Sequence, residues 1–176
     1  MRIEELKTFY IVDTLDNHKS IKPELLAYFD NVQSDNGTGH SSDAIQRLDW
    51  SRAKDFTRPW AKYFTESIND KLMAVITELG YNEYAIDELW FQQYVQDGYH
   101  GWHAHGSSFT AVYYLELNAD APRTELIEPY MQGKKIVADV QEGDLLLFPS
   151  FVIHRAPKIV SDTRKTIISF NINFYY

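Results

Sequence analysis

From residue 89 onward, the sequence is a series of short apolar and aromatic runs that turn residues separate. The runs occupy residues 89–94, 109–117, 135–140, 145–148 and 166–174. Runs of this length, rich in β-branched and aromatic residues, are typical of the strands of a sandwich or barrel. The clearest turn, Glu142-Gly143-Asp144, opens the buried run at 145–148, and Pro149 ends that run. The second half of the chain is therefore predicted to be a β-sandwich or barrel.

The first half has helical periodicity instead. Apolar residues recur at helical spacing in 20–32, with Pro23 in the first turn, and in 59–79, where Thr57 is the expected cap and Pro59 lies in the first turn. A strand is expected at 9–12, and turn residues predict an exposed loop at 33–44. Helices followed by strands predict an α+β protein. Because no repeat or boundary appears, we expect 1–176 to form one domain, helical over about 1–85 and β over about 86–176.

Charge and composition narrow the classes of function. The chain has 25 acidic and 17 basic residues and a formal net charge of −8, so its field repels phosphate backbones and nucleic acid is a disfavoured partner. The absence of cysteine leaves His, Asp and Glu as the strong metal ligands. No apolar run is long enough to predict a signal peptide or a membrane span. We therefore expect no membrane partner and a cytoplasmic location.

Three histidines are candidates for a metal site. His103 and His105 flank Ala104, and the period of two along a strand points both imidazoles to the same face. His154 lies beyond the run at 145–148 and the Pro149-Ser150 break, where it can project into the mouth of a barrel. Paired histidines also occur as hydrogen-bonded core residues, so the pair predicts a metal only if folding brings His154 to it.

The order of motifs around these histidines resembles that of the 2-oxoglutarate and iron(II)-dependent oxygenases, in particular the small prolyl-hydroxylase-like proteins of bacteriophages and marine bacteria. The similarity spans residues 90–173, nearly half of the chain. It rests on His103-Ala104-His105, Tyr113-Tyr114-Leu115, Glu142-Gly143-Asp144, Phe148-Pro149-Ser150, His154 and Arg164-Lys165. The resemblance implies a double-stranded β-helix, a cupin-like jelly roll, with the N-terminal helices packed on the major sheet.

The resemblance also implies an activity. His103, His105 and His154 would hold Fe(II) as catalytic metal ligands, and three protein ligands on one face of a six-coordinate iron leave three positions open. The cosubstrate 2-oxoglutarate would take two of these positions and O2 the third. Oxidative decarboxylation of 2-oxoglutarate would then be coupled to hydroxylation of a C–H bond, in a small-molecule or peptidyl substrate such as a prolyl residue or an amino acid.

One position departs from the family's pattern, in which the second ligand is a carboxylate, because this chain has His105 there. Three versions of the site follow. The first uses three histidines, the second brings in a carboxylate from Asp97 or Glu125, and the third has two histidines and an extra open position that a halide could enter, as in halogenases. His100 is a reserve ligand, because its odd spacing from His103 predicts the opposite strand face.

The distal carboxylate of the cosubstrate requires a cation. Arg164 lies ten residues after His154, as the family's spacing requires, whereas strand parity with Ser169 and Asn171 favours Lys165. Both residues are kept as cosubstrate-binding candidates, together with Ser169, and the preference is slightly for Arg164. Tyr114 aligns with a family tyrosine that binds the same carboxylate, although a core role is as well supported.

Two alternative functions are also consistent with the sequence. The chain could instead be a three-histidine cupin-type dioxygenase that does not use 2-oxoglutarate, or a jelly-roll binding protein without catalysis.

Trp102 is a candidate wall of the pocket, and Trp50, Trp60 and Trp90 are expected in the core. Monomer and homodimer are left open, and the cytoplasm would be that of the host if the protein is viral.

Overall fold

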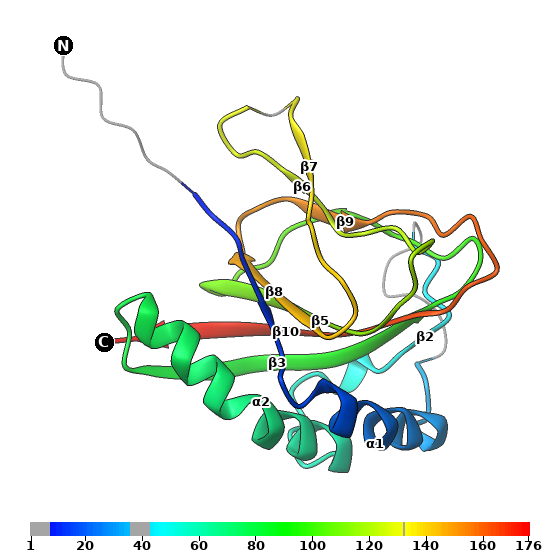
Figure 1. The fold of residues 1–176 in the computed structure, drawn as a ribbon, viewed down its shortest axis with the longest axis horizontal. Coiled ribbons are helices and arrows are strands. Elements are labelled where there is room, and N and C mark those ends of the chain that lie inside the picture. The colour runs from blue at the N-terminus through cyan, green and yellow to red at the C-terminus, as the bar shows by residue number, and fades with distance from the viewer. Residues whose placement is uncertain (1–7, 36–42, 132) are drawn as a thin grey trace.

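The computed structural model describes residues 8–35, 43–131 and 133–176. Two antiparallel sheets face each other, and two helices cover the outer face of the larger sheet (Figure 1). The larger sheet has the order β1-β8-β5-β10-β3-β2 and the smaller β4-β9-β6-β7. The predicted α+β double-stranded β-helix, with N-terminal helices on the major sheet, is therefore confirmed.

The elements have the following bounds. The larger sheet contains β1 (Ile11–Thr14), β2 (Arg47–Leu48), β3 (Glu83–Tyr94), β5 (Phe109–Leu117), β8 (Asp144–Pro149) and β10 (Lys165–Tyr175). The smaller sheet contains β4 (His100–His103), β6 (Glu125–Ile127), β7 (Lys135–Val137) and β9 (His154–Ala156). The helices are α1 (His18–Asn31), the short 3₁₀ helix η1 (Trp50–Arg52) and α2 (Pro59–Glu78). No helix in the described part of the chain is long and apolar enough to cross a membrane.

Helix α2 packs on the larger sheet through the stripe that its sequence predicts. Its buried side chains recur every three or four residues, which places them on one face. They are Trp60, Ala61, Phe64, Ile68, Leu72, Val75 and Ile76. The predicted cap is wrong, because the residue before the helix is Arg58, and the Thr57 hydroxyl donates to the Asp55 carboxylate instead. This stripe forms one continuous core with the helix-facing side of the sheet.

Alternation along β10 divides its side chains between two cores. Ile168, Phe170 and Ile172 face the helices, whereas Ile167 belongs to the core between the two sheets. Lys165 shares the parity of Ile167, so it lies on the side of the smaller sheet. This parity decides which side chains of β10 can enter a site between the sheets.

The tight turn before β8 forms as the sequence predicts. Gly143 has a φ of +92°, a backbone conformation that glycine adopts without strain. A Cβ at this position would also come within 3.1 Å of the His18 ring on α1. Most of the predicted loop, residues 36–42, lies outside the described residues.

Candidate metal centre

Three histidines converge at one end of the smaller sheet. His103 ends β4, His154 begins β9, and the two residues are direct partners in the antiparallel pairing. His105 follows two residues after His103, and its backbone N–H donates to the Ser150 carbonyl at 2.9 Å. One ligating nitrogen from each of the three rings lies within 4.8 Å of the others. The structure thus brings together the three histidines that the sequence singled out.

Backbone carbonyls orient two of the rings. The Nδ1 of His103 lies 2.8 Å from the Gly101 carbonyl, and the Nδ1 of His154 lies 3.0 Å from the Val152 carbonyl. An Nδ1–H that donates to a carbonyl leaves the Nε2 lone pair available, which is the usual arrangement of a metal-ligating histidine. The geometry therefore fits a metal ion bound through Nε2.

The protonation state of the rings also suits a metal. Burial lowers the pKa of His105 to about 4, with further contributions from His103 and His100. Burial and the same neighbouring rings hold the pKa of His154 well below its usual value. Both rings are therefore neutral near pH 7, and neutral imidazole is the form that binds metals.

The two carboxylates considered as alternative ligands are engaged elsewhere. Asp97 is exposed and pairs with Lys158 at 2.6 Å. Glu125 pairs with Lys135 at 2.7 Å and with Arg155 at 2.6 Å. Among the residues that the structure describes, no carboxylate belongs to the histidine cluster.

His100 does not lie on the opposite face from His103, so that prediction is wrong. A register shift in β4 between the two residues offsets their odd spacing. Their rings stack, with centroids 3.9 Å apart and an interplanar angle of 21°. His100 Nε2 also lies 3.3 Å from the Asp43 carboxylate.

A cavity of about 20 Å³ extends from the histidines into the space between the sheets. Its lining includes Trp90, Tyr94, Val112, Thr124, Ile167 and Ser169. The Tyr94 side chain is 1% exposed, and its hydroxyl has no hydrogen-bond partner among the residues that the structure describes. Sequence analysis did not select Tyr94, although it shares strand parity with Trp90 in the predicted strand 89–94. Its hydroxyl is a buried donor to this cavity.

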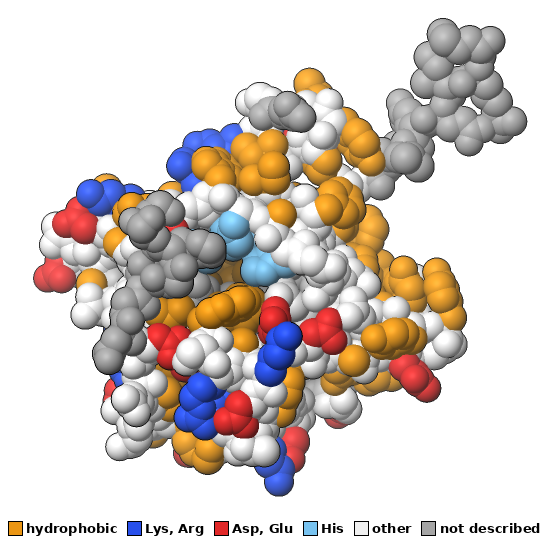
Figure 2. Space-filling view, turned by 180° about the vertical axis from the view of Figure 1, so that it is seen from behind, with side chains coloured by type: hydrophobic (Ala, Val, Ile, Leu, Met, Phe, Trp, Pro, Cys, Tyr) orange, Lys and Arg blue, Asp and Glu red, His pale blue; other side chains and the backbone are white. Residues whose placement is uncertain are grey.

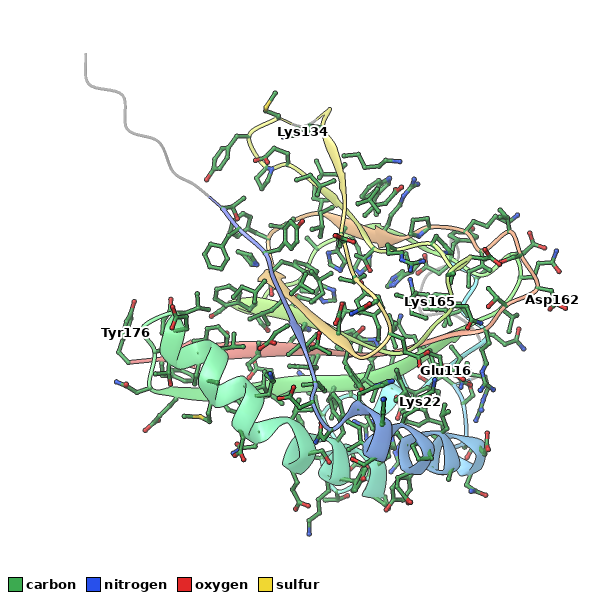
Figure 3. All side chains as sticks on the ribbon, viewed as in Figure 1. Lys22, Glu116, Lys134, Asp162, Lys165 and Tyr176 are labelled. Atoms are coloured by element: carbon green, nitrogen blue, oxygen red, sulfur yellow. The ribbon has the colours of Figure 1, made fainter. Side chains whose placement is uncertain are left out.

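Lys165 lies in the space between the two sheets (Figure 3). Its side chain is 1% exposed, its ammonium donates to the Pro122 carbonyl at 2.8 Å, and it lies 5.6 Å from the centroid of the Tyr114 ring. Burial, and secondarily the charge of Arg123, lower the pKa of Lys165 to about 7. The Tyr114 hydroxyl is 2.6 Å from that of Thr124, which lines the cavity.

Arg164 points away from this space. Its guanidinium forms two hydrogen bonds with the Glu116 carboxylate, at 2.9 and 2.7 Å, and is half-exposed. Arg164, which has the expected ten-residue spacing, therefore pairs with Glu116, whereas Lys165, which has the right parity, points between the sheets. Ser169 is buried and donates to the Gln92 side chain at 3.3 Å.

A larger cleft of about 210 Å³ adjoins the other side of the histidines. Figure 2 shows histidine side chains in a hollow beside hydrophobic ones. Trp90 is buried as predicted, but Trp50 is 41% exposed and lines the cleft, so its predicted core position is wrong. Trp102 lines neither cavity and instead lies 4.5 Å from the Arg155 guanidinium, which corrects its predicted role as a pocket wall.

Part of the chain, including the three histidines, matches the model of a known protein family. Residues 88–171, slightly less than half of the chain, match the family model described as putative 2-oxoglutarate–Fe(II) oxygenase. No curated protein sequence matches significantly. The resemblance inferred from the motifs is thus confirmed over the β-rich part of the chain.

Solved structures of low sequence identity share the fold. An oxidoreductase of the 2-oxoglutarate–Fe(II) oxygenase family from Burkholderia pseudomallei has a TM-score of 0.70 at 13% identity, covering 93% of this chain and 83% of that one. The viral collagen prolyl hydroxylase of Paramecium bursaria Chlorella virus 1, in complex with 2-oxoglutarate, has a TM-score of 0.64 at 14% identity and covers 96% of both chains. HygX from Streptomyces hygroscopicus, with nickel and 2-oxoglutarate bound, has a TM-score of 0.71 at 10% identity, covering 94% and 82%.

Proposed function

We propose that the protein is an Fe(II) dioxygenase that couples oxidative decarboxylation of 2-oxoglutarate to hydroxylation of a C–H bond in a prolyl or other amino-acid substrate. The observation that carries this proposal is the convergence of three imidazoles next to a cavity between the sheets, with a buried lysine in the same space between the sheets. The family match over residues 88–171 supports the same chemistry. The viral collagen prolyl hydroxylase, a structural neighbour, supports a peptidyl substrate.

The donor set fits ferrous iron held by His103, His105 and His154. Imidazole is a good ligand for iron, and three neutral rings leave its full double charge for the dianionic cosubstrate to offset. When bound, the iron supplies dioxygen activation: one oxygen atom enters succinate as CO2 leaves, and the other enters the hydroxyl group of the product. Asp97 and Glu125 are committed to ion pairs, so we favour the three-histidine version of the site.

The side chains around the inner cavity would bind the cosubstrate. We assign the distal carboxylate of 2-oxoglutarate to Lys165 and not to Arg164, because only Lys165 points between the sheets. The Tyr94 hydroxyl, which has no hydrogen-bond partner in the described part of the chain, would be a further donor to that ligand. Tyr114, through its bond to Thr124, and Ser169 position the walls.

The cavity walls would also exclude water. Its apolar lining includes Trp90, Val112 and Ile167. A dry site strengthens electrostatic interactions and protects the reaction from side reactions. The chain's own residues therefore bind the cosubstrate, hold it in one orientation and keep water out.

The direct test is binding of 2-oxoglutarate and release of succinate with added ferrous iron. We expect the wild type to do both, His154→Ala to lose metal binding, and Lys165→Met to lose affinity for 2-oxoglutarate at least about tenfold, or about 1.4 kcal/mol. Arg164→Met is the matched control, because it removes the neighbouring cation that faces Glu116. Failure of the metal-loaded wild type to bind 2-oxoglutarate would reject the proposal.

The same donor set favours a second candidate, a three-histidine dioxygenase that does not use 2-oxoglutarate. That enzyme would bind iron through the same residues but would have no use for a cation at Lys165. Calorimetry with an unreactive 2-oxoglutarate analogue separates the two functions. Affinity that depends on Lys165 supports the first, and metal binding without analogue binding supports the second.

A further inference from the structure

Asp43 is a carboxylate that lies beside the three converging histidines without belonging to their cluster. Its side chain is 5% exposed, so the carboxylate has lost most of its hydration and needs hydrogen bonds in return. The partners that it has include the backbone of Gly101 and the ring of His100. Each of these two contacts leads to His103.

The first contact reaches His103 through the backbone. One oxygen of Asp43, Oδ1, accepts a hydrogen bond from the Gly101 N–H at 2.9 Å. The carbonyl of Gly101 lies 2.8 Å from the Nδ1 of His103. Asp43 therefore holds the residue whose carbonyl orients the His103 ring, and this orientation leaves the Nε2 available to a metal.

The second contact reaches His103 through a stacked ring. The other oxygen of Asp43, Oδ2, lies 3.3 Å from the Nε2 of His100. The His100 ring lies over that of His103, with centroids 3.9 Å apart and an interplanar angle of 21°. On its other side, the Nδ1 of His100 lies 3.4 Å from the Gln92 amide nitrogen. A ring held in this way blocks one face of His103, so the His103 imidazole cannot tilt toward that side.

Backbone hydrogen bonds hold Asp43 itself in place. The next residue, Ala44, forms an antiparallel bridge with Tyr99, through hydrogen bonds of 3.0 and 2.9 Å. Two residues further on, the Gln46 N–H donates to the Gln93 carbonyl at 3.0 Å. The segment that follows Asp43 is thus tied both to β3 and to the residue that precedes β4.

We propose that Asp43 is a positioning residue of the metal site, which holds His103 in its ligating orientation through Gly101 and His100. This inference rests on the proposed function for its metal, and it would apply equally to the second candidate function. Groups that orient a metal-binding histidine typically change metal affinity by ~10- to 100-fold. The chain has His105 where the family's pattern has a carboxylate ligand, and Asp43 supplies a carboxylate one contact further from the metal.

The test is titration of the full chain with Co(II), followed by proton NMR of the Co(II)-loaded protein. A ligand imidazole N–H that donates to a carbonyl exchanges slowly with water and gives a signal shifted by the paramagnetic ion. We expect Asp43→Ala to weaken Co(II) binding at least about tenfold and to lose one such signal by exchange. The signal of His154 should remain, because the Val152 carbonyl orients that ring independently of Asp43.

Asp43→Asn is the conservative variant. Its amide oxygen can still accept a hydrogen bond from Gly101, so it should keep the His103 signal. Its affinity for Co(II) should fall by about threefold, because hydrogen bonds to a neutral amide are weaker than those to a carboxylate. A role limited to folding would lower the stability of the metal-free chain in urea without this graded effect on the N–H signals.

Asp97→Asn is the matched control, since Asp97 lies in the connection before β4 and pairs with Lys158 at 2.6 Å. It should bind Co(II) as the wild type does. Wild-type affinity in Asp43→Ala would overturn the inference; should that variant not fold, wild-type affinity in Asp43→Asn would do the same. A wild type that binds no Co(II) would overturn both proposals. Co(II)-loaded wild type that does not bind 2-oxoglutarate would reject the proposed function alone, and the Asp43 variants would still decide this inference.

Discussion

Lys165 is a single residue that would set the conditions under which the proposed site binds an anion. An ammonium group at 1% exposure loses most of its hydration, and this burial lowers its pKa to about 7. In the described part of the chain, its neighbours include the Pro122 carbonyl, the Tyr114 ring and the positively charged Arg123. None of these three is an anion. A bound carboxylate would supply the missing charge and return Lys165 to its protonated form.

The affinity for 2-oxoglutarate should therefore depend on pH. Above about pH 7, Lys165 is largely neutral in the free protein, so binding of the carboxylate must take up a proton. We expect affinity to be nearly constant below about pH 7 and to fall by about tenfold per pH unit above it. Calorimetry in buffers of different ionisation enthalpy measures the proton uptake. Lys165→Arg should flatten the profile, and a wild-type affinity that is constant from pH 6.5 to pH 9 would contradict the prediction.

The burial of Lys165 also lowers the free energy of unfolding, because its ammonium group loses hydration in the folded state. Because its folded pKa of about 7 lies below its unfolded value of 10.5, the penalty is fully present below pH 7 and decreases as the pH rises toward 10.5. Lys165→Met should raise the free energy of unfolding by about 1 to 2 kcal/mol at pH 6.5, with a smaller gain at pH 9. Urea denaturation at the two pH values measures this. A variant less stable than the wild type at both would show that the lysine stabilises the fold.

Sequence reasoning selected the three histidines that converge in the structure, but it ranked the lysine second. Strand parity pointed to Lys165, and the family's ten-residue spacing pointed to Arg164. Parity placed Lys165 correctly between the sheets, because β10 pairs with β3 without a register shift from Lys165 to Asn171 and its side chains therefore alternate there. The exposure of Trp50 could not be predicted, since it depends on hydrogen bonds that Asp49 makes to residues far along the chain.

At the scale of elements, Asp49 joins η1, α2 and β3. Its carboxylate pairs with Arg58 and accepts hydrogen bonds from Trp60 and Phe91. The pKa of Asp49 is raised, because burial outweighs the opposing effect of Arg58. Arg58 also donates to the Leu89 carbonyl at 2.6 Å.

Removal of the Asp49 carboxylate should loosen all three elements. Asp49→Ala leaves a buried guanidinium without its counter-charge, which typically costs about 3 to 5 kcal/mol. Urea denaturation measures the loss. Asp55→Ala breaks the exposed pair with Arg52 and is the control, expected to cost about 1 kcal/mol or less. Equal effects of the two changes would contradict the role given to Asp49.

The long elements were predictable, whereas three of the short strands were not. The run at 109–117 has the bounds of β5, and the stripe beginning at Trp60 has those of α2 to within a residue or two. Strands β4, β6 and β9 have three or four residues each, too few for an alternating pattern to be recognised. The register shift that brings His100 beside His103 leaves no signal in the sequence. The histidine site therefore had to be inferred from motif order.

At the scale of the whole molecule, the candidate site lies between the two sheets. The smaller sheet supplies His103 and His154, and the larger sheet supplies Lys165 and Tyr94. A metal-bound cosubstrate that reaches Lys165 would therefore connect the sheets. We propose that residues 1–176 behave as one domain, so that this connection stabilises the entire fold.

Ligand binding should accordingly raise the free energy of unfolding in two steps. A metal at 100 times its dissociation constant should add about 2.7 kcal/mol, and saturating 2-oxoglutarate should add a further increment in the same single transition. His154→Ala should lose both steps, whereas Lys165→Met should retain the metal step and lose the second, because the three proposed metal ligands do not include Lys165. Thermal unfolding with Mn(II), with and without 2-oxoglutarate, measures both steps. Two separate transitions, or a cosubstrate step that survives in Lys165→Met, would show that the ligand does not connect the two sheets through this lysine.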